Sequence, residues 1–215
     1  SMKVSRNLLS NYINLDGISD AELAKRLTFA GIEVETYEKL SNATGLVVGE
    51  VLTQEKVADS DHLSLCSVNL GAKGGVVQII CGAPNVAAGQ KVIVAQVGAV
   101  LPELTIKKTT IKGHESNGMI CALNELGVDQ SFSEEDNNGI YVLPSEAKVG
   151  NEEVLKYLGL DDTIFDIRPL ANRSDMLAIY NIVKELSALF NRPFTLPNFS
   201  VKQTFKSKLT LDIKT

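Results

Sequence analysis

The stretch VVQIICGAPNVAAGQKVIVAQV, residues 76–97, holds two runs rich in strand-forming residues on either side of a turn signal. Val76–Cys81 and Lys91–Val97 are dominated by β-branched side chains, which are enriched in strands. Between them, Gly82-Ala83-Pro84-Asn85 combines residue types that favour turns. Glycine allows positive φ angles, proline fixes φ, and the side chain of asparagine can hydrogen-bond its own backbone. The stretch therefore predicts two short strands separated by a sharp corner.

The same pattern extends in both directions, from Gly45 to Leu143. Further short runs rich in strand-forming residues lie at Leu46–Leu52, Leu63–Leu70, Thr105–Ile111 and Ile140–Leu143. Turn signals rich in glycine or asparagine separate some of them, as at 71–75 and 137–139. About five or six short strands within about 100 residues predict a small closed barrel or a sandwich.

Helical periodicity appears on both sides of this β-rich region. Ser19-Asp20-Ala21-Glu22 fits a capping box, and the apolar spacing that follows predicts a helix over about 20–30 and then a short strand at Ile32–Glu35. On the other side, the pattern predicts a short helix around Val154–Leu158 and a longer one over about 174–190. Because each flanking segment is too small to bury a core alone, we expect the two to pack on each other.

The predicted fold class is therefore α+β and mostly β, with a barrel inserted into a small split helical domain. The split domain comprises residues 1–40 and 151–193, and the barrel comprises residues 41–150. Residues 194–215 would begin a further domain, because Lys208–Lys214 alternate like a strand that lacks a partner in this chain.

The composition is that of a soluble globular protein, with 44% hydrophobic and 22% charged residues among 215. The longest apolar runs fall short of the roughly 18 residues that a membrane helix needs. Three cysteines, without a C-x-x-C pair or a secretion signal, indicate reduced thiols, a cytoplasmic location and no zinc site. A net charge of −5 argues against strong electrostatic binding of nucleic acid by this chain alone.

Four motifs recur in order through the β-rich region. They are Asp59-Ser60-Asp61-His62-Leu63, Ile79-Ile80-Cys81-Gly82-Ala83-Pro84-Asn85, Val97-Gly98-Ala99-Val100-Leu101-Pro102, and Ile111–Ala122 followed by Glu125-Leu126-Gly127. Their order and spacing closely resemble the oligonucleotide-binding (OB-fold) barrel that several tRNA-binding proteins share. The resemblance implies a five-stranded barrel that binds tRNA.

The flanking segments carry a second resemblance. The residues concerned are Val4–Leu9, Ala30–Glu35, Phe165–Ile167, Asn172–Leu177 and Lys184–Leu189. They look like the amino-terminal part of bacterial phenylalanyl-tRNA synthetase β subunits. Many members of that family have His-Pro where this chain has Val57-Ala58, and proline where it has Ala171.

This family resemblance implies part of an α2β2 ligase that couples ATP hydrolysis to the attachment of phenylalanine to its tRNA. The implied partners are tRNA, the α subunit and a second β subunit, with no membrane or DNA partner. Aminoacylation, editing, ATP and magnesium sites would lie in the α subunit and in other β-subunit domains. The resemblance therefore implies no catalytic residue, metal ligand or cofactor within this chain.

Candidate tRNA-binding residues follow from the chemistry of such barrels, which use cationic side chains for phosphate and small polar residues where the backbone is approached closely. The candidates are Lys56, His62, Asn85, Lys107, Lys108, Lys112, Ser116, Asn117, Met119, Asn172 and Arg173. If Thr105–Ile111 is one strand, Lys107 and Lys108 point to opposite faces, so only one of them can serve a given RNA groove.

Each candidate also has a structural interpretation. The lysines can belong to a solvated edge strand. Residues 116–119 can form a tight turn, and Asn85 can stabilise a corner through its own backbone. Arg173 can pair with an acidic neighbour such as Asp175. His62 and His114 could act as general bases, but no motif places a nucleophile beside either one.

Within 41–150 there are seven lysines, no arginine, twelve acidic residues and two aromatic residues, Phe132 and Tyr141. We therefore expect weak, salt-sensitive tRNA binding by the isolated chain, whose role would be to dock and orient tRNA within a larger enzyme. The alternatives are a structural module that contacts other subunits and has lost RNA binding, and a free-standing tRNA-binding protein.

Overall fold

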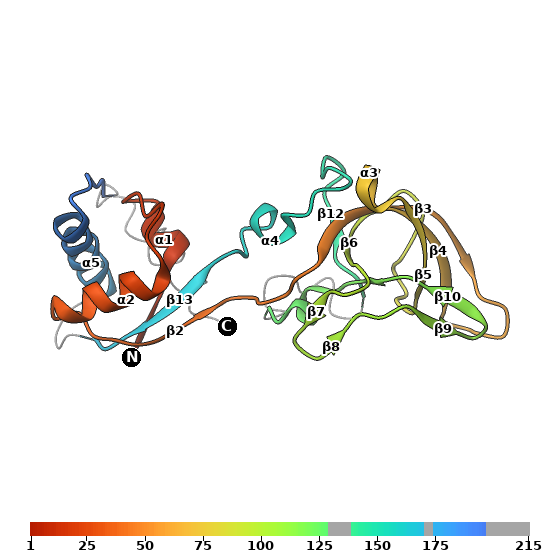
Figure 1. Cartoon of the computed structure of the whole chain (residues 1–215), viewed down its shortest axis with the longest axis horizontal. Helices are drawn as coiled ribbons and strands as arrows, with labels where there is room; N and C mark the ends of the chain where they lie inside the picture. The colour runs from red at the N-terminus through yellow and green to blue at the C-terminus, as the bar shows by residue number, and fades with distance from the viewer. Residues whose placement is uncertain (129–138, 170–173, 197–215) are drawn as a thin grey trace. The chain divides into compact units, whose positions relative to one another are not determined.

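A computed structural model of the chain describes residues 1–128, 139–169 and 174–196, and its contacts divide the chain into two compact units (Figure 1). The frame unit combines the segment up to Leu40 with the segment from Asp161 onward, and the barrel unit is Ser41–Leu160. Residues 151–160 thus lie with the barrel unit, whereas the sequence placed them with the flanking segments. The reason is local, because the N–H of Val48 donates to the carbonyl of Asn151 at 2.9 Å.

The frame unit holds a small antiparallel sheet as well as helices. Its elements are β1 (Met2–Ser5), α1 (Arg6–Ser10), α2 (Asp20–Phe29), β2 (Val34–Lys39), β13 (Thr163–Ile167) and α5 (Asp175–Phe190). The strand order is β1-β13-β2, with Val4 opposite Phe165 and Phe165 opposite Tyr37. The sequence predicted only the strand near residue 34, because four- and five-residue strands show too little alternation to be recognised.

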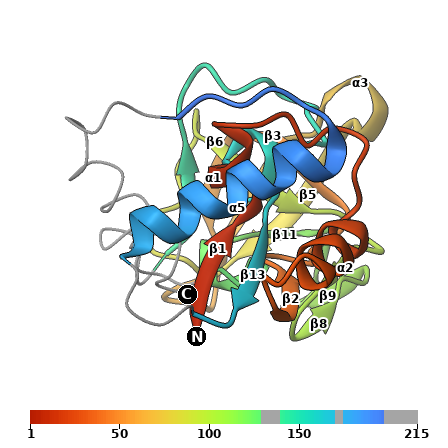
Figure 2. The same ribbon diagram turned by 90° about the vertical axis from the view of Figure 1, so that its left-hand side faces the viewer.

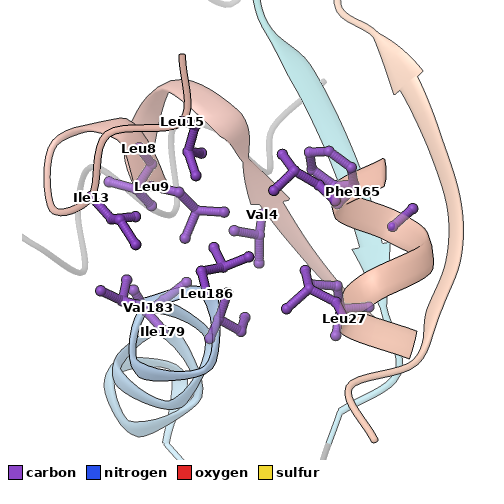
Figure 3. Close-up of a cluster of buried hydrophobic side chains, with 14 of the residues drawn as sticks. Val4, Leu8, Leu9, Ile13, Leu15, Leu27, Phe165, Ile179, Val183 and Leu186 are labelled. Carbon is purple, nitrogen blue, oxygen red and sulfur yellow. The ribbon is translucent and has the colours of Figure 1, made fainter. Parts of the chain in front are cut away.

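The helices cover one face of this sheet, and Figure 2 shows α5 lying across β1 and β13. The side chains of Leu8, Leu27, Phe165 and Leu186 meet in one buried cluster (Figure 3). The two flanking segments of the sequence do pack on each other, since this cluster draws on residues from both. It is the burial of these apolar side chains, contributing roughly 1.5–3 kcal/mol each, that holds the frame together.

Both longer helices begin where the sequence predicts. The Ser19 hydroxyl accepts the N–H of Glu22 at the start of α2, and the Ser174 hydroxyl accepts the N–H of Leu177 at the start of α5. Each cap satisfies one of the otherwise unpaired N–H groups of a first turn. The left-handed conformation of Asn191, with φ of 52°, ends α5.

The barrel unit is built on an antiparallel sheet with strand order β11-β6-β3-β4-β5. These strands are β3 (Leu46–Lys56), β4 (Ser64–Asn69), β5 (Val76–Cys81), β6 (Lys91–Ala95) and β11 (Met119–Ile120). β12 (Val142–Leu143) pairs with β6 off this path. The short helices α3 (Gly71–Gly74) and α4 (Val154–Tyr157) and the 3-10 turn η1 (Leu123–Leu126) complete the described elements of this unit.

Hydrogen bonds bring the far end of the sheet back toward β5. The N–H of Asn117 donates to the carbonyl of Gln78 at 2.8 Å, and the Ser116 hydroxyl accepts the N–H of Ile80 at 3.0 Å. Apolar side chains that include Val51, Val68 and Val94 fill the interior. The five strands therefore form a nearly closed antiparallel barrel, which confirms the predicted fold class.

Two small hairpins project between β6 and β11. They are β7 (Val100–Leu101) with β8 (Leu104–Thr105), and β9 (Thr109–Ile111) with β10 (His114–Ser116). The predicted single strand over Thr105–Ile111 is therefore wrong. Residues 106–108 lie in no strand, because backbone hydrogen bonds from Ile106 to Ala99 and from Gly98 to Ile106 end the first hairpin there. The side chain of Ile106 is buried.

Three free cysteines, Cys66, Cys81 and Cys121, are buried within the barrel unit. Burial raises the pKa of the Cys66 thiol to about 11 and that of Cys121 to about 12, because a thiolate loses its hydration inside the protein. The nearby Cys81 adds to the shift at Cys66. The native thiols therefore stay protonated and unreactive at neutral pH.

Because the pKa values of these buried thiols are raised, we expect the barrel unit to lose stability as pH rises from about 9 to 11. An unfolded chain releases its thiol protons near pH 9, the ordinary value, while the folded chain still holds them, so the stability present below pH 9 is lost as pH rises. Urea midpoints measured by circular dichroism between pH 8 and 11 will show this fall. The fall should be smaller in a Cys66→Ala variant, and equal falls in the two proteins would contradict the assignment.

Candidate nucleic-acid interface

One end of β5 and the two projecting hairpins enclose a groove of about 850 Å³. Its lining comes from residues 80–83, from residues 104–107, 109 and 111 of the two hairpins, from residues 116 and 118–120, and from residues 122, 124 and 125. Gly139 and Ile140 complete it. The volume lies within the range of about 300–1,000 Å³ that is usual for ligand sites.

The walls of the groove are mainly apolar. Ile80, Ile106 and Ile120 are buried beneath it, whereas Leu104 and Ile111 expose 48% and 36% of their surface beside it. Large apolar side chains that remain this exposed at a groove mark a surface that a ligand or partner can cover. The groove therefore offers contact area rather than a dense set of charges.

Two of the described residues that line the groove are charged, and they differ in depth. Lys107 is exposed and forms no ion pair with any described residue. Glu125 is half-buried, and its Oε1 accepts the N–H of Ala122 at 2.8 Å. Burial is the main cause of the raised pKa of Cys121, and the negative charge of Glu125 is the second cause. The carboxylate of Glu125 therefore lies near the barrel interior.

The structure separates Lys107 from the other candidate lysines. Lys108 pairs with Glu115 at 3.0 Å and does not line the groove. Lys112 lies at the tip of the β9–β10 hairpin with φ of 53°, and Lys56 ends β3 as an exposed residue. Lys107 alone of the four candidates faces the groove with its charge unpaired by a described residue.

The candidates at 116–119 divide into residues that hold the barrel wall and a residue that contacts the groove. Ser116 is buried, and its hydroxyl accepts from Ile80 and donates to the carbonyl of Gly118. The side-chain amide of Asn117 donates to Gln78 at 3.4 Å, so it joins the barrel wall. Met119 is half-buried and lines the groove. Ser116 and Asn117 thus hold the wall in place, and Met119 supplies contact surface.

Asn85 has a structural role, but its side chain bonds to a distant segment and not to its own backbone as the sequence suggested. Its side chain donates to the carbonyl of Ile140 and accepts the N–H of the same residue, both at 2.9 Å. His62 is exposed in the loop between β3 and β4, and its Nδ1 lies 3.1 Å from Asp61. Asn172 and Arg173 lie outside the described residues.

Of the groove residues, sequence reasoning selected Lys107, Ser116 and Met119 but not Glu125 or the isoleucine and leucine side chains of the walls. Glu125 stands three residues after Ala122, whose N–H it accepts, and two before the left-handed Gly127, but alanine at the first position lacks the side-chain acceptor of a capping box and so gives only a weak turn signal. That signal predicts local structure and says nothing of a groove, because the groove forms only when β5 and the hairpins come together. Its apolar walls look like ordinary core residues in the sequence.

Residues 46–152 match the family described as "Putative tRNA binding domain". This range contains every residue that lines the groove. The barrel is a tRNA-binding domain. Barrels of this architecture bind nucleic acid through one face of the sheet and through connecting loops.

Two curated relatives extend the match beyond the tRNA-binding domain. The chain is 45% identical over 205 residues to the phenylalanine–tRNA ligase beta subunit of Geobacillus kaustophilus, covering 94% of this chain and 25% of that protein. It is 44% identical over 199 residues to the same subunit of Bacillus subtilis, covering 91% and 24%. These matches confirm the resemblance found in the sequence. The chain spans about a quarter of the length of these relatives.

Among solved structures, a MetRS-related protein from Pyrococcus horikoshii aligns with 49% of this chain and 84% of its own, at 23% identity and a TM-score of 0.34. This likeness is too low to add to the assignment. Within the described residues, no helix is long and apolar enough to cross a membrane, and no cluster of three metal-ligating side chains occurs.

Proposed function

We propose that this chain docks tRNA for a phenylalanine–tRNA ligase whose chemistry takes place elsewhere in the enzyme. The observation that carries the proposal is the groove of the tRNA-binding domain, where Lys107 stands exposed and without an acidic partner among the described residues. A tRNA that is already held in the correct orientation reacts faster, because binding has removed much of the entropic cost of bringing the reactants together. The chain would act by holding and orienting its ligand.

The same proposal covers the rest of the enzyme. The chain would act in the cytoplasm within an α2β2 assembly, next to an α subunit and a second β subunit. ATP and magnesium would be bound by other parts of that enzyme. The described residues do not fit a magnesium site, since they offer no cluster of metal-ligating side chains, and no step of the reaction is assigned to them.

The charge distribution predicts weak binding by this chain alone. A net charge of −5 gives a net repulsion of the phosphate backbone, which opposes the contacts that single lysines can form. We expect the chain to bind its tRNA with a dissociation constant of about 10⁻⁶ M or weaker at physiological salt. Docking in the full enzyme would then depend on contacts from several domains at once.

Replacing Lys107 with alanine should weaken tRNA binding, whereas the matched change Lys108→Ala should have little effect. Lys107 is free to meet a phosphate, while Lys108 is held by Glu115. We expect a three- to tenfold loss of affinity, which is about the contribution of one phosphate contact. The slope of log K against log salt concentration should become smaller by about 1. Filter binding at several salt concentrations measures both quantities. Equal effects of the two changes would contradict this role for Lys107.

A second candidate function is a structural module that contacts other subunits. The exposed apolar side chains of Val100, Leu104 and Ile111 favour it, because such residues are common in protein interfaces. The charge reversal Lys107→Glu in the full enzyme separates the two functions. Slower charging with a raised KM for tRNA supports docking, and unchanged charging kinetics with intact assembly support the structural role.

A further inference from the structure

We infer that the groove of the tRNA-binding domain is a pocket for a single unstacked guanine base, with Glu125 binding the Watson–Crick edge of the base and Lys107 binding its phosphate. The inference rests on the proposed function and names the part of the RNA that enters the groove. Single-stranded or looped RNA is commonly bound through bases that leave the stack and enter such sites.

The positions of the two charges define which end of a nucleotide enters. Lys107 is exposed, whereas Glu125 is half-buried and close enough to the interior to raise the pKa of the buried thiols Cys81 and Cys121. A phosphate placed near Glu125 would be repelled by the carboxylate. The same phosphate placed near Lys107 would meet a lysine that no described acidic residue neutralises. The base therefore points inward and the phosphate stays at the solvent side.

The walls suit the flat face of a base. Ile80, Ile106 and Met119 line the groove without charge. A nucleobase carries its polar groups on its edge and exposes an apolar face, so such walls cover the faces while the edge reaches deeper. Ordinary pocket walls are likewise mainly apolar, with a few polar groups that fix orientation and specificity.

Glu125 selects among the four bases because a carboxylate only accepts hydrogen bonds. Its two oxygens provide about four acceptor positions, and the N–H of Ala122 takes one of them. Guanine presents two adjacent donors, N1–H and N2–H, on its Watson–Crick edge. Adenine and cytosine each present one amino group beside a ring nitrogen that accepts, and uracil presents one N–H between two carbonyls. Only guanine places two donors side by side opposite the carboxylate.

Four pentaribonucleotides test the inference: UUGUU, UUAUU, UUCUU and UUUUU. Each is titrated into the 215-residue chain, with binding followed by fluorescence anisotropy and by the methyl resonance of Met119. We expect UUGUU to bind about five- to tenfold more tightly than the other three, as is usual for discrimination by a good pair of hydrogen bonds. The Met119 signal should shift on binding, because this side chain lines the groove.

The variant Glu125→Gln should abolish the preference for guanine. The glutamine carbonyl can still accept the N–H of Ala122, so the capped turn is retained, but its amide group places a donor against the donors of guanine. Glu115→Gln is the matched control, since Glu115 pairs with Lys108 outside the groove lining. This control should keep the full preference.

The outcomes separate this inference from the function on which it rests. Equal binding of all four pentamers, weakened alike by Lys107→Ala, overturns the guanine pocket and leaves tRNA docking intact. A guanine preference that survives Glu125→Gln also overturns it. If neither the pentamers nor tRNA binds, and Lys107→Glu leaves the charging kinetics of the full enzyme unchanged, the proposed function fails as well. A Met119 shift caused by purified α subunit, and by none of the RNAs, overturns the inference and makes the groove a protein contact.

Discussion

Replacing Phe165 with alanine is expected to lower the free energy of unfolding of the frame unit by about 3–5 kcal/mol. Phe165 lies on the central strand β13 with 1% of its surface exposed, opposite Val4 on one side and Tyr37 on the other. Removing the ring loses its burial and leaves a cavity that strands and helices on all sides cannot close. A typical domain is stable by only about 5–15 kcal/mol, so this change threatens the whole unit.

Tyr37→Ala is the matched control for this prediction. Its ring centre lies 5.7 Å from that of Phe165 in the same cross-strand pair, but Tyr37 is 43% exposed on the edge strand. We expect a cost of about 0.5–1.5 kcal/mol, the usual size of an aromatic pair. Hydrogen exchange of β1 and β13 in increasing urea reports on this unit alone. A cost for Phe165→Ala as small as that of the control would show that the core is not built as described.

Gly71→Ala should destabilise the barrel unit by about 2–5 kcal/mol. Gly71 has φ of 91°, a conformation that costs an L-residue about 1–2 kcal/mol. An added Cβ would also lie 2.8 Å from the Cα of Gly150, which is backbone and cannot rotate away. Forcing extra volume into such a contact costs about 1–3 kcal/mol more. The close approach of these two glycines joins α3 to the segment that follows β12.

Gly89→Ala isolates the conformational part of this effect, so the difference between the two variants gives the steric part. Gly89 also has φ of 91°, but a Cβ added there would meet nothing within 4 Å. It should therefore cost only the conformational part, about 1–2 kcal/mol. Urea unfolding followed by circular dichroism compares the two variants directly. If both changes cost the same, the contact with Gly150 does not limit the packing of the barrel.

Local patterns predicted the elements whose cause is local. The hydroxyls of Ser19 and Ser174 cap helices that begin at the expected residues, because a cap needs partners only two or three positions away. The β-rich runs predicted the main barrel strands for a similar reason. The strands β1 and β13 went unpredicted, since each is too short to show a period and exists through pairing with the other, some 160 residues away.

The candidate site was predictable only as a region. Lys107 and Lys108 are identical neighbours in the sequence, and their difference arises because Glu115, on the next hairpin strand, neutralises one of them. Asn85 and Ser116 have the residue types of RNA ligands, but their polar atoms bond to the main chain of Ile140 and Ile80. Which polar groups remain available is a property of the folded neighbours.

By itself, the sequence determined the helix starts, the main barrel strands, the family resemblance and the net charge of −5 that disfavours RNA binding, because these depend on residues close together in the chain or on composition. The tertiary structure alone decided that a groove forms, that Lys107 faces it unpaired by any described residue, and that Glu125 lies deeper within it. The physical reason is that burial and pairing are set by three-dimensional neighbours, and residues 80–83, 104–125 and 139–140 become neighbours only when the barrel closes.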